Sequence, residues 1–196
     1  MFAPFEEFKR KITISAVDAN TGMKITMTDK EIDFKDLPIA VMGSASVPGV
    51  FPVTPYLGHH LIDGMTAYNT DVQATIDRCK DIVGEYENNI TIDVLQISSP
   101  ATADVWDSPA KMAYSNYERA SALKDAHVGG DQLEAVKRAH PHIHWRHEIV
   151  QSVKTTGTDE LNFDQTVLQP LIDYGKQDAQ TALAARAVNE DLTFLN

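Results

Sequence analysis

The chain has 196 residues, enough for one domain with a hydrophobic core but not clearly enough for two. Its 28 acidic and 17 basic side chains give a formal net charge of −11, which disfavours binding to nucleic acids and electrostatic attraction to anionic lipids. The single cysteine, Cys79, excludes an internal disulfide bond and a zinc site built from cysteines.

The first half of the chain predicts a β-hairpin, a helix and a short strand. In chain order these elements span residues 11–17, 23–28, 36–45 and 60–62. Both hairpin strands alternate apolar and polar residues, and a turn-forming cluster of Asp, Asn, Thr and Gly separates them. Asp36 is expected to cap the helix, with Pro38 in its first turn. Prolines and glycines interrupt residues 46–57, which we expect to form an ordered loop.

The second half of the chain predicts helices that alternate with strands. The helices are expected over residues 72–86, 109–124, 131–139 and 169–183, and the strands over 90–97 and 143–150. Asn69 or Thr70 is expected to cap the first of these helices, and Cys79 lies in its apolar stripe as a small core residue. The apolar run at 90–97 is typical of a strand covered on both faces. This alternation predicts an α/β fold with a partly parallel sheet and helices on its faces.

Two short motifs support a chemical hypothesis. Residues 43–52 are rich in Ser, Ala, Pro and Gly, and Asp63-Gly64 follows after ten residues. A carboxylate at the end of a short strand, followed by glycine, lies where the backbone can turn sharply and leave the side chain exposed at the sheet edge. Such a carboxylate can orient or deprotonate a hydroxyl group, although most Asp-Gly pairs are plain turns.

Together these residues resemble the patatin-like phospholipase family of lipid acyl hydrolases. The resemblance is strong over residues 11–99 and looser up to 183. It implies a three-layer α/β fold in which helices flank a patatin-like sheet. Residues 1–196 would form a single domain that corresponds to the C-terminal part of this fold. The resemblance also implies lipid degradation by a Ser–Asp dyad, in which the serine attacks a lipid ester and the aspartate takes its proton. The site residues implied are the catalytic Asp63, with Gly64, Pro48 and Gly49 supporting the motif.

The chain departs from the family pattern at several positions. Met65 stands where the family has Gly or Ala, and Asp71 stands where Pro is usual. No glycine is followed two residues later by serine, so the chain has no Gly-x-Ser-x-Gly elbow to hold the nucleophile. Ser44 and Ser46 are expected to form hydrogen bonds at a helix end rather than replace that nucleophile. We therefore expect the chain to supply the catalytic aspartate and to be inactive alone.

Two functions remain as alternatives. The first is an ester hydrolase that acts on a lipid or another ester once an N-terminal half completes the site. The second is a non-catalytic lipid-binding or protein-interaction module on a remnant of the same fold. Neither requires a cofactor. Without the other half, four side chains are expected to form an uncovered apolar face, which predicts self-association or a partner chain. These four are Ile12, Ile14, Ile92 and Val94.

A run of histidines, His140, His142, His144 and His147, is the second cluster of chemical interest. Alternate histidines on a strand share a face, as a metal site requires. Arg146 would share that face with His142 and His144 and repel a cation, and His147 would point the other way. A solvated strand edge is therefore favoured, no metal is predicted, and the role of the histidines stays open.

The chain starts without a basic region followed by an apolar run, so no secretory signal is predicted. Prolines and serines interrupt its most apolar stretch, residues 37–53, which disfavours a membrane-spanning helix. A cytoplasmic protein is the expectation. An apolar loop is formed by Val50, Phe51, Pro52, Val53 and Tyr56. It is expected to touch lipid, as a peripheral membrane contact, or to line an acyl groove, unless Phe51 packs onto the core.

Overall fold

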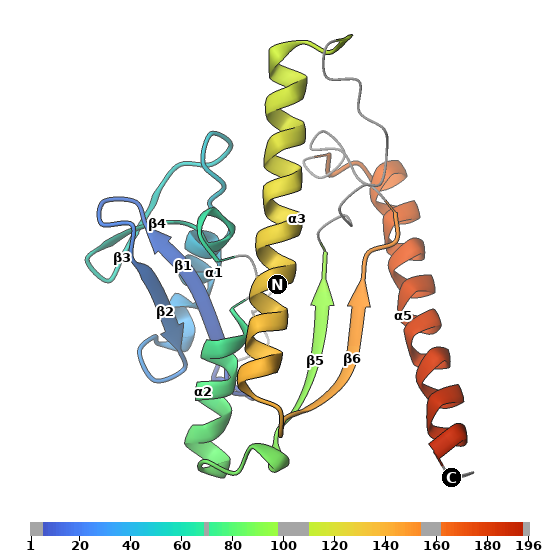
Figure 1. The fold of residues 1–196 in the computed structure, drawn as a ribbon. Coiled ribbons are helices and arrows are strands. Elements are labelled where there is room, and N and C mark those ends of the chain that lie inside the picture. Colours follow the sequence, from blue (N-terminus) through green and yellow to red (C-terminus); the bar gives the residue numbers. More distant parts are fainter. Residues whose placement is uncertain (1–5, 69–70, 98–109, 154–161, 194–196) are drawn as a thin grey trace. The chain divides into compact units, whose positions relative to one another are not determined.

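Two units make up the computed structural model, which describes residues 6–68, 71–97, 110–153 and 162–193 (Figure 1). Unit 1 holds residues 1–87 and 128–141, and unit 2 holds residues 88–127 and 142–196. The fold is mixed α/β, as the sequence predicts at this coarse level. The finer expectations, a single domain and a patatin-like three-layer sheet, stay predictions.

Unit 1 is built on an antiparallel sheet of four strands in the order β2-β1-β4-β3. The strands are β1 (Thr13–Asp18), β2 (Lys24–Thr28), β3 (Thr54–Tyr56) and β4 (His59–Asp63). β1 and β2 form the predicted hairpin, and β4 confirms the strand that leads into Asp63. The prediction of a loop throughout residues 46–57 is wrong, because β3 pairs with β4 across a turn at Leu57-Gly58. Both turn residues have positive φ, which is the geometry that closes a tight hairpin.

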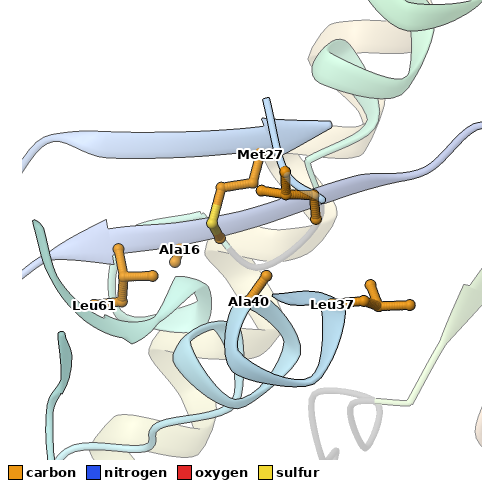
Figure 2. Packing of buried hydrophobic residues seen from close by; sticks show 6 residues of the cluster. Ala16, Met27, Leu37, Ala40 and Leu61 are labelled. Carbon is orange, nitrogen blue, oxygen red and sulfur yellow. The ribbon is translucent and has the colours of Figure 1, made fainter. Parts of the chain in front are cut away.

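Helix α1 (Leu37–Ser44) covers one face of this sheet, and a 3-10 turn, η1 (Phe34–Asp36), precedes it. Figure 2 shows Leu37 and Ala40 of α1 beside Met27 and Leu61 of the sheet. Phe8, Ile12 and Ile14 pack against the same core. Asp36 occupies the predicted N-cap position but makes no side-chain capping bond. Its carboxylate instead accepts a 3.4 Å hydrogen bond from the Tyr56 hydroxyl.

Helix α2 (Val72–Val83) follows in unit 1 and is joined to the hairpin by charged groups. Its N-cap is Asp71, whose carboxylate accepts from the Ala74 N–H, rather than Asn69 or Thr70, which lie outside the described residues. Arg78 forks onto both carboxylate oxygens of Asp29, at 2.9 and 3.0 Å, and both side chains are buried. Cys79 is half-buried in the helix.

Unit 2 contains a parallel pair of strands, β5 (Thr91–Gln96) and β6 (His144–Val150). The prediction that the strand at 90–97 is covered on both faces is wrong, because its burial alternates. Ile92 and Val94 are buried, whereas Leu95 is 68% exposed. The prediction that Ile12, Ile14, Ile92 and Val94 form an uncovered apolar face is therefore also wrong. Ile92 and Val94 are buried, and Ile12 and Ile14 pack against the core of unit 1.

The long helices are α3 (Ala113–Ala139) and α5 (Gln165–Thr193), and a 3-10 turn, η3 (Glu87–Asn89), precedes β5. The two helices predicted at 109–124 and 131–139 are one helix, because Gly129-Gly130 does not end it. Each glycine within a helix costs only about 1 kcal/mol relative to alanine, which the turns on either side can offset. Pro170 lies inside α5, which begins four residues before the predicted start.

Candidate active site around Asp63

Asp63 lies at the last position of β4, where the strand ends between two other segments. It pairs with Ala16 of β1, and its backbone N–H donates a 3.0 Å hydrogen bond to the carbonyl oxygen of Ser46. The structure therefore brings together the two motifs that the sequence analysis singled out, residues 43–52 and Asp63-Gly64. The backbone of Asp63 is held from both sides.

The Asp63 carboxylate is half-buried and has one hydrogen bond among the described residues. Its Oδ1 accepts from the Met65 N–H at 2.8 Å and thereby caps a 3-10 turn, η2 (Gly64–Thr66). No donor from the described part of the chain contacts Oδ2. Burial raises the pKa of Asp63, and the Met65 hydrogen bond offsets part of that rise. A carboxylate with a raised pKa and one oxygen without a donor among the described residues is chemically suited to accept a proton.

The backbone of β1 passes very close to Gly64, the residue that follows Asp63. A Cβ atom at this position would lie 3.0 Å from the carbonyl oxygen of Ser15. The same carbonyl accepts a 2.7 Å hydrogen bond from the Ser44 hydroxyl. The carbonyl oxygen of Ser15 thus lies close to both motifs, and a side chain at position 64 would require the backbone there to give by a few tenths of an ångström.

The two serines of the first motif are engaged in hydrogen bonds. Ser46 is buried, and its hydroxyl lies 2.7 Å from the Met42 carbonyl and 2.9 Å from the Thr54 hydroxyl. The bond to Met42 confirms the expected helix-end role of Ser46. Ser44 bonds to the strand β1 instead. Neither arrangement places a serine hydroxyl on the Asp63 carboxylate.

The Pro48-Gly49 pair forms a turn that presents apolar side chains. Gly49 has a φ of +86°, which favours glycine, and the N–H groups of Val50 and Phe51 donate to the Val47 carbonyl. Phe51 keeps 46% of its surface exposed, with Val50 and Val53 exposed beside it. The interpretation of Phe51 as a residue packed onto the core is therefore wrong, and the loop offers an apolar surface.

Ser15 of β1 contacts the carboxylate of Asp71, a Ser–carboxylate pair that the sequence did not indicate. The Ser15 hydroxyl donates to Asp71 at 2.5 Å, and Lys24 of β2 donates to the same carboxylate at 3.0 Å. Because Asp71 also accepts from the Ala74 N–H, its contacts join the hairpin to the start of α2. Strand alternation could have placed Ser15 on the face opposite Ala16, but nothing local in the sequence pairs it with Asp71.

Asp18, at the end of β1, is a buried carboxylate with several donors. The N–H groups of His60 and Asn20 and the hydroxyl of Thr21 donate to it at 3.1, 3.2 and 2.9 Å, and His59 lies at 3.5 Å. Burial raises the pKa of Asp18, but these hydrogen bonds together outweigh burial and lower the pKa to about 2. Asp18 therefore remains charged at neutral pH and organises the turn that follows β1.

The four histidines of the second cluster do not form a common site. His144 and Arg146 lie on the exposed face of β6, and His147 lies on the half-buried face with Trp145, as the alternation predicted. Arg146 forks onto the Asp93 carboxylate of β5, and His142 is exposed before the strand. Within the described ranges, no group of three or more His, Cys, Asp or Glu residues is placed to hold a metal ion.

Comparisons with known proteins add nothing to this geometry. No family model and no curated protein matches the chain. Within the part of the chain that the structure describes, no helix is long and apolar enough to cross a membrane.

Proposed function

We propose that residues 1–196 are part of a lipid acyl hydrolase of the patatin type, in which Asp63 is the base of a Ser–Asp dyad. The nucleophilic serine and the oxyanion-binding loop would come from a segment outside these residues, because no Gly-x-Ser-x-Gly elbow occurs in the sequence. The observation that supports the proposal most is the half-buried Asp63 carboxylate, whose Oδ2 has no donor among the described residues.

The surroundings of Asp63 fit the work of a general base. A base acts best when its pKa approaches the working pH, and burial shifts the Asp63 pKa upward in that direction. Its main chain is held by Ser46 and by the pairing with Ala16, and the Met65 N–H holds one carboxylate oxygen, which restricts where the carboxylate can lie. Such fixed placement is a large part of catalytic power, since small misplacements of a reacting group are costly.

The character of the neighbouring segment favours a lipid substrate over a charged, water-soluble ester. Residues 37–58, which pair with β4 and cover it, contain no charged side chain. Several of their apolar side chains are exposed, and these are Ile39, Val41, Met42, Val50, Phe51, Val53 and Leu57. Exposed apolar side chains near a candidate base are typical of a surface that contacts acyl chains.

The decisive test changes Asp63 in a protein that also contains the nucleophile segment, supplied in cis or as a separate chain. Asp63→Asn keeps the size of the side chain but removes the proton acceptor. We expect kcat/KM for a phospholipid or p-nitrophenyl ester to fall about 100-fold or more, with an unchanged melting curve. Residues 1–196 alone should show no esterase activity and no labelling by a fluorophosphonate.

Two matched variants serve as controls. Asp33→Asn removes the same charge from an exposed aspartate, and His144→Ala changes an exposed histidine. Both should retain nearly full activity. The proposal is wrong if Asp63→Asn retains full activity, or if residues 1–196 alone are labelled stoichiometrically at one serine. Binding of phosphatidylcholine vesicles without hydrolysis in any combination would favour the non-catalytic lipid-binding alternative instead.

A further inference from the structure

The side chain of His140 is held between two other elements of unit 1. His140 follows the last residue of α3, and its backbone N–H still donates to the Val136 carbonyl. Its Nδ1 lies 2.6 Å from Oε1 of Glu87 in η3, and its Nε2 lies 2.9 Å from Oε1 of Gln73 in α2. Only 12% of the His140 side chain and 16% of the Glu87 side chain are exposed.

Both partners of the imidazole ring are hydrogen-bond acceptors. The Glu87 carboxylate has no proton to donate when it is ionised. The orientation of the Gln73 amide is set by Asp77, because the Gln73 Nε2 donates to the Asp77 carboxylate at 2.8 Å and leaves Oε1 toward His140. Both ring nitrogens must therefore donate. A neutral imidazole has one N–H group, so only the protonated ring makes both bonds at once.

Other charged groups lie around this contact, and they act first on Glu87. Lys80 of α2 donates to the Glu87 carboxylate at 3.0 Å and also lies 3.4 Å from Glu85. The hydrogen bond from His140, followed by the bond from Lys80, lowers the pKa of Glu87, so this carboxylate stays ionised in weakly acidic solution. On α3 itself, Lys137 pairs with Glu134 at 2.9 Å, and Arg138 is exposed.

We propose that His140, Glu87 and Gln73 form a pH-dependent clasp that holds the C-terminal end of α3 against α2 and η3. Protonation of His140 adds the second hydrogen bond and makes the bond to Glu87 an ion pair. Charge-assisted bonds are roughly twice as strong as neutral ones. The clasp is therefore expected to hold more firmly with the ring protonated, when it makes two donor bonds, than with the ring neutral, when it makes one. Histidine is the side chain that ordinarily changes charge between about pH 5 and 8.

Hydrogen exchange of the full chain tests the clasp directly. Exchange of backbone amides in residues 134–140 and 73–80 is followed from pH 5.5 to 8.5 and corrected for the intrinsic pH dependence of exchange. We expect the corrected protection of these segments to fall about tenfold as pH rises, which corresponds to the loss of one charge-assisted hydrogen bond. Protection of β1 and β2 should not change with it.

Two variants separate the clasp from a purely structural role. His140→Gln keeps a polar side chain of similar reach but cannot gain a charge, so its corrected protection should be low and independent of pH. His142→Gln changes an exposed histidine two residues away and should behave like the unmodified chain. Nitrogen chemical shifts of the His140 ring provide a second measurement, and at pH 5.5 both nitrogens should carry protons that exchange slowly.

The proposal is overturned by either of two results. One is a corrected protection that does not change between pH 5.5 and 8.5 in the unmodified chain. The other is the same pH dependence in the His140→Gln variant, which would assign the effect to another group. The experiment uses neither a substrate nor a nucleophile segment, so its outcome is independent of the function proposed for Asp63.

Discussion

At the scale of single residues, the carboxylates of unit 1 divide by what surrounds them. Asp63 has one donor among the described residues, and burial raises its pKa. Asp18 has three close donors, and the pKa of its carboxyl falls to about 2. The Arg78 guanidinium, more than any other group, holds the pKa of Asp29 well below its usual range. Hydrogen-bond count thus distinguishes a candidate base from carboxylates that stabilise the fold.

The depressed pKa of Asp18 predicts how stability depends on acid. An aspartate ordinarily titrates near pH 3.9 in an unfolded chain, whereas Asp18 titrates at about 2 in the folded state. The stabilisation is therefore complete above about pH 4 and is lost as pH falls toward 2. We expect Asp18→Asn to unfold at lower urea concentration at pH 7 and to show a shallower loss of stability between pH 4 and 2.

Urea unfolding at several pH values checks this prediction, and Asp33→Asn is the control. Asp33 is exposed, and among the described residues its carboxylate pairs with the exposed Lys35, so its replacement should leave the pH profile unchanged. An Asp18→Asn variant with the same pH profile as the unmodified chain would show that Asp18 does not contribute to acid sensitivity. Asp29 should keep part of the acid dependence in every variant, because its pKa is lowered as well.

At the scale of elements, the contact between α1 and β4 depends on the absence of a side chain at Gly43. A Cβ atom there would lie 2.6 Å from Cδ1 and 2.9 Å from Cβ of Leu61. Leu61 is fully buried in the core of unit 1 and belongs to the strand that ends at Asp63. The helix can approach the sheet this closely only with glycine at the contact, and this approach sets where Ser46 meets Asp63.

The Gly43→Ala variant therefore shows which of two opposing effects is larger, the gain in helix propensity or the cost of overpacking. Alanine should favour the helix by about 1 kcal/mol, but overpacking at a buried contact costs about 1–3 kcal/mol. We expect a net destabilisation in urea unfolding. Gly130→Ala in α3 is the matched control, because a Cβ atom there meets nothing within 4 Å, and it should stabilise the chain by about 1 kcal/mol. Equal stabilisation by both variants would contradict the packing argument.

At the scale of the whole molecule, a strong net negative charge is combined with exposed apolar side chains. The formal charge of −11 opposes association of two copies, and salt screens this repulsion. Apolar side chains stay exposed in both units, for example Phe51 and Val53 in unit 1 and Leu95 and Ile97 in unit 2. Self-association remains a prediction. The apolar side chains available for it are these exposed ones, not the four that the sequence indicated.

We predict that residues 1–196 associate in a concentration-dependent way and that added salt strengthens the association. Light scattering at micromolar concentration in 50 mM and 500 mM salt measures it. Replacing Leu95 and Ile97 by serine should shift the equilibrium toward the monomer, because it removes exposed apolar surface. The matched replacement of Thr91 by serine, on the same exposed face of β5, should not. A monomer at both salt concentrations would contradict the prediction.

The sequence alone determined the elements that depend on neighbouring residues. Alternation indicated the β1–β2 hairpin and β6, and helical spacing indicated α2, because side-chain direction follows from local backbone geometry. It also placed Asp63 at a strand end before glycine, and separated His147 from His144 and Arg146. A local pattern cannot show what covers a strand, so the single buried face of β5 was not predicted. The continuity of α3 was not predicted either, because Gly129-Gly130 is a pair that often ends a helix.

The tertiary structure decided the contacts between residues that are far apart in the chain. Ser15 meets Asp71 across 56 positions, Arg78 meets Asp29 across 49, and His140 meets Gln73 across 67. It also set the surroundings of Asp63, since burial and the Ser46 carbonyl act on it only after β4 has paired with β1. The physical reason is that burial and hydrogen-bond partners belong to the folded arrangement, whereas periodicity belongs to the chain itself.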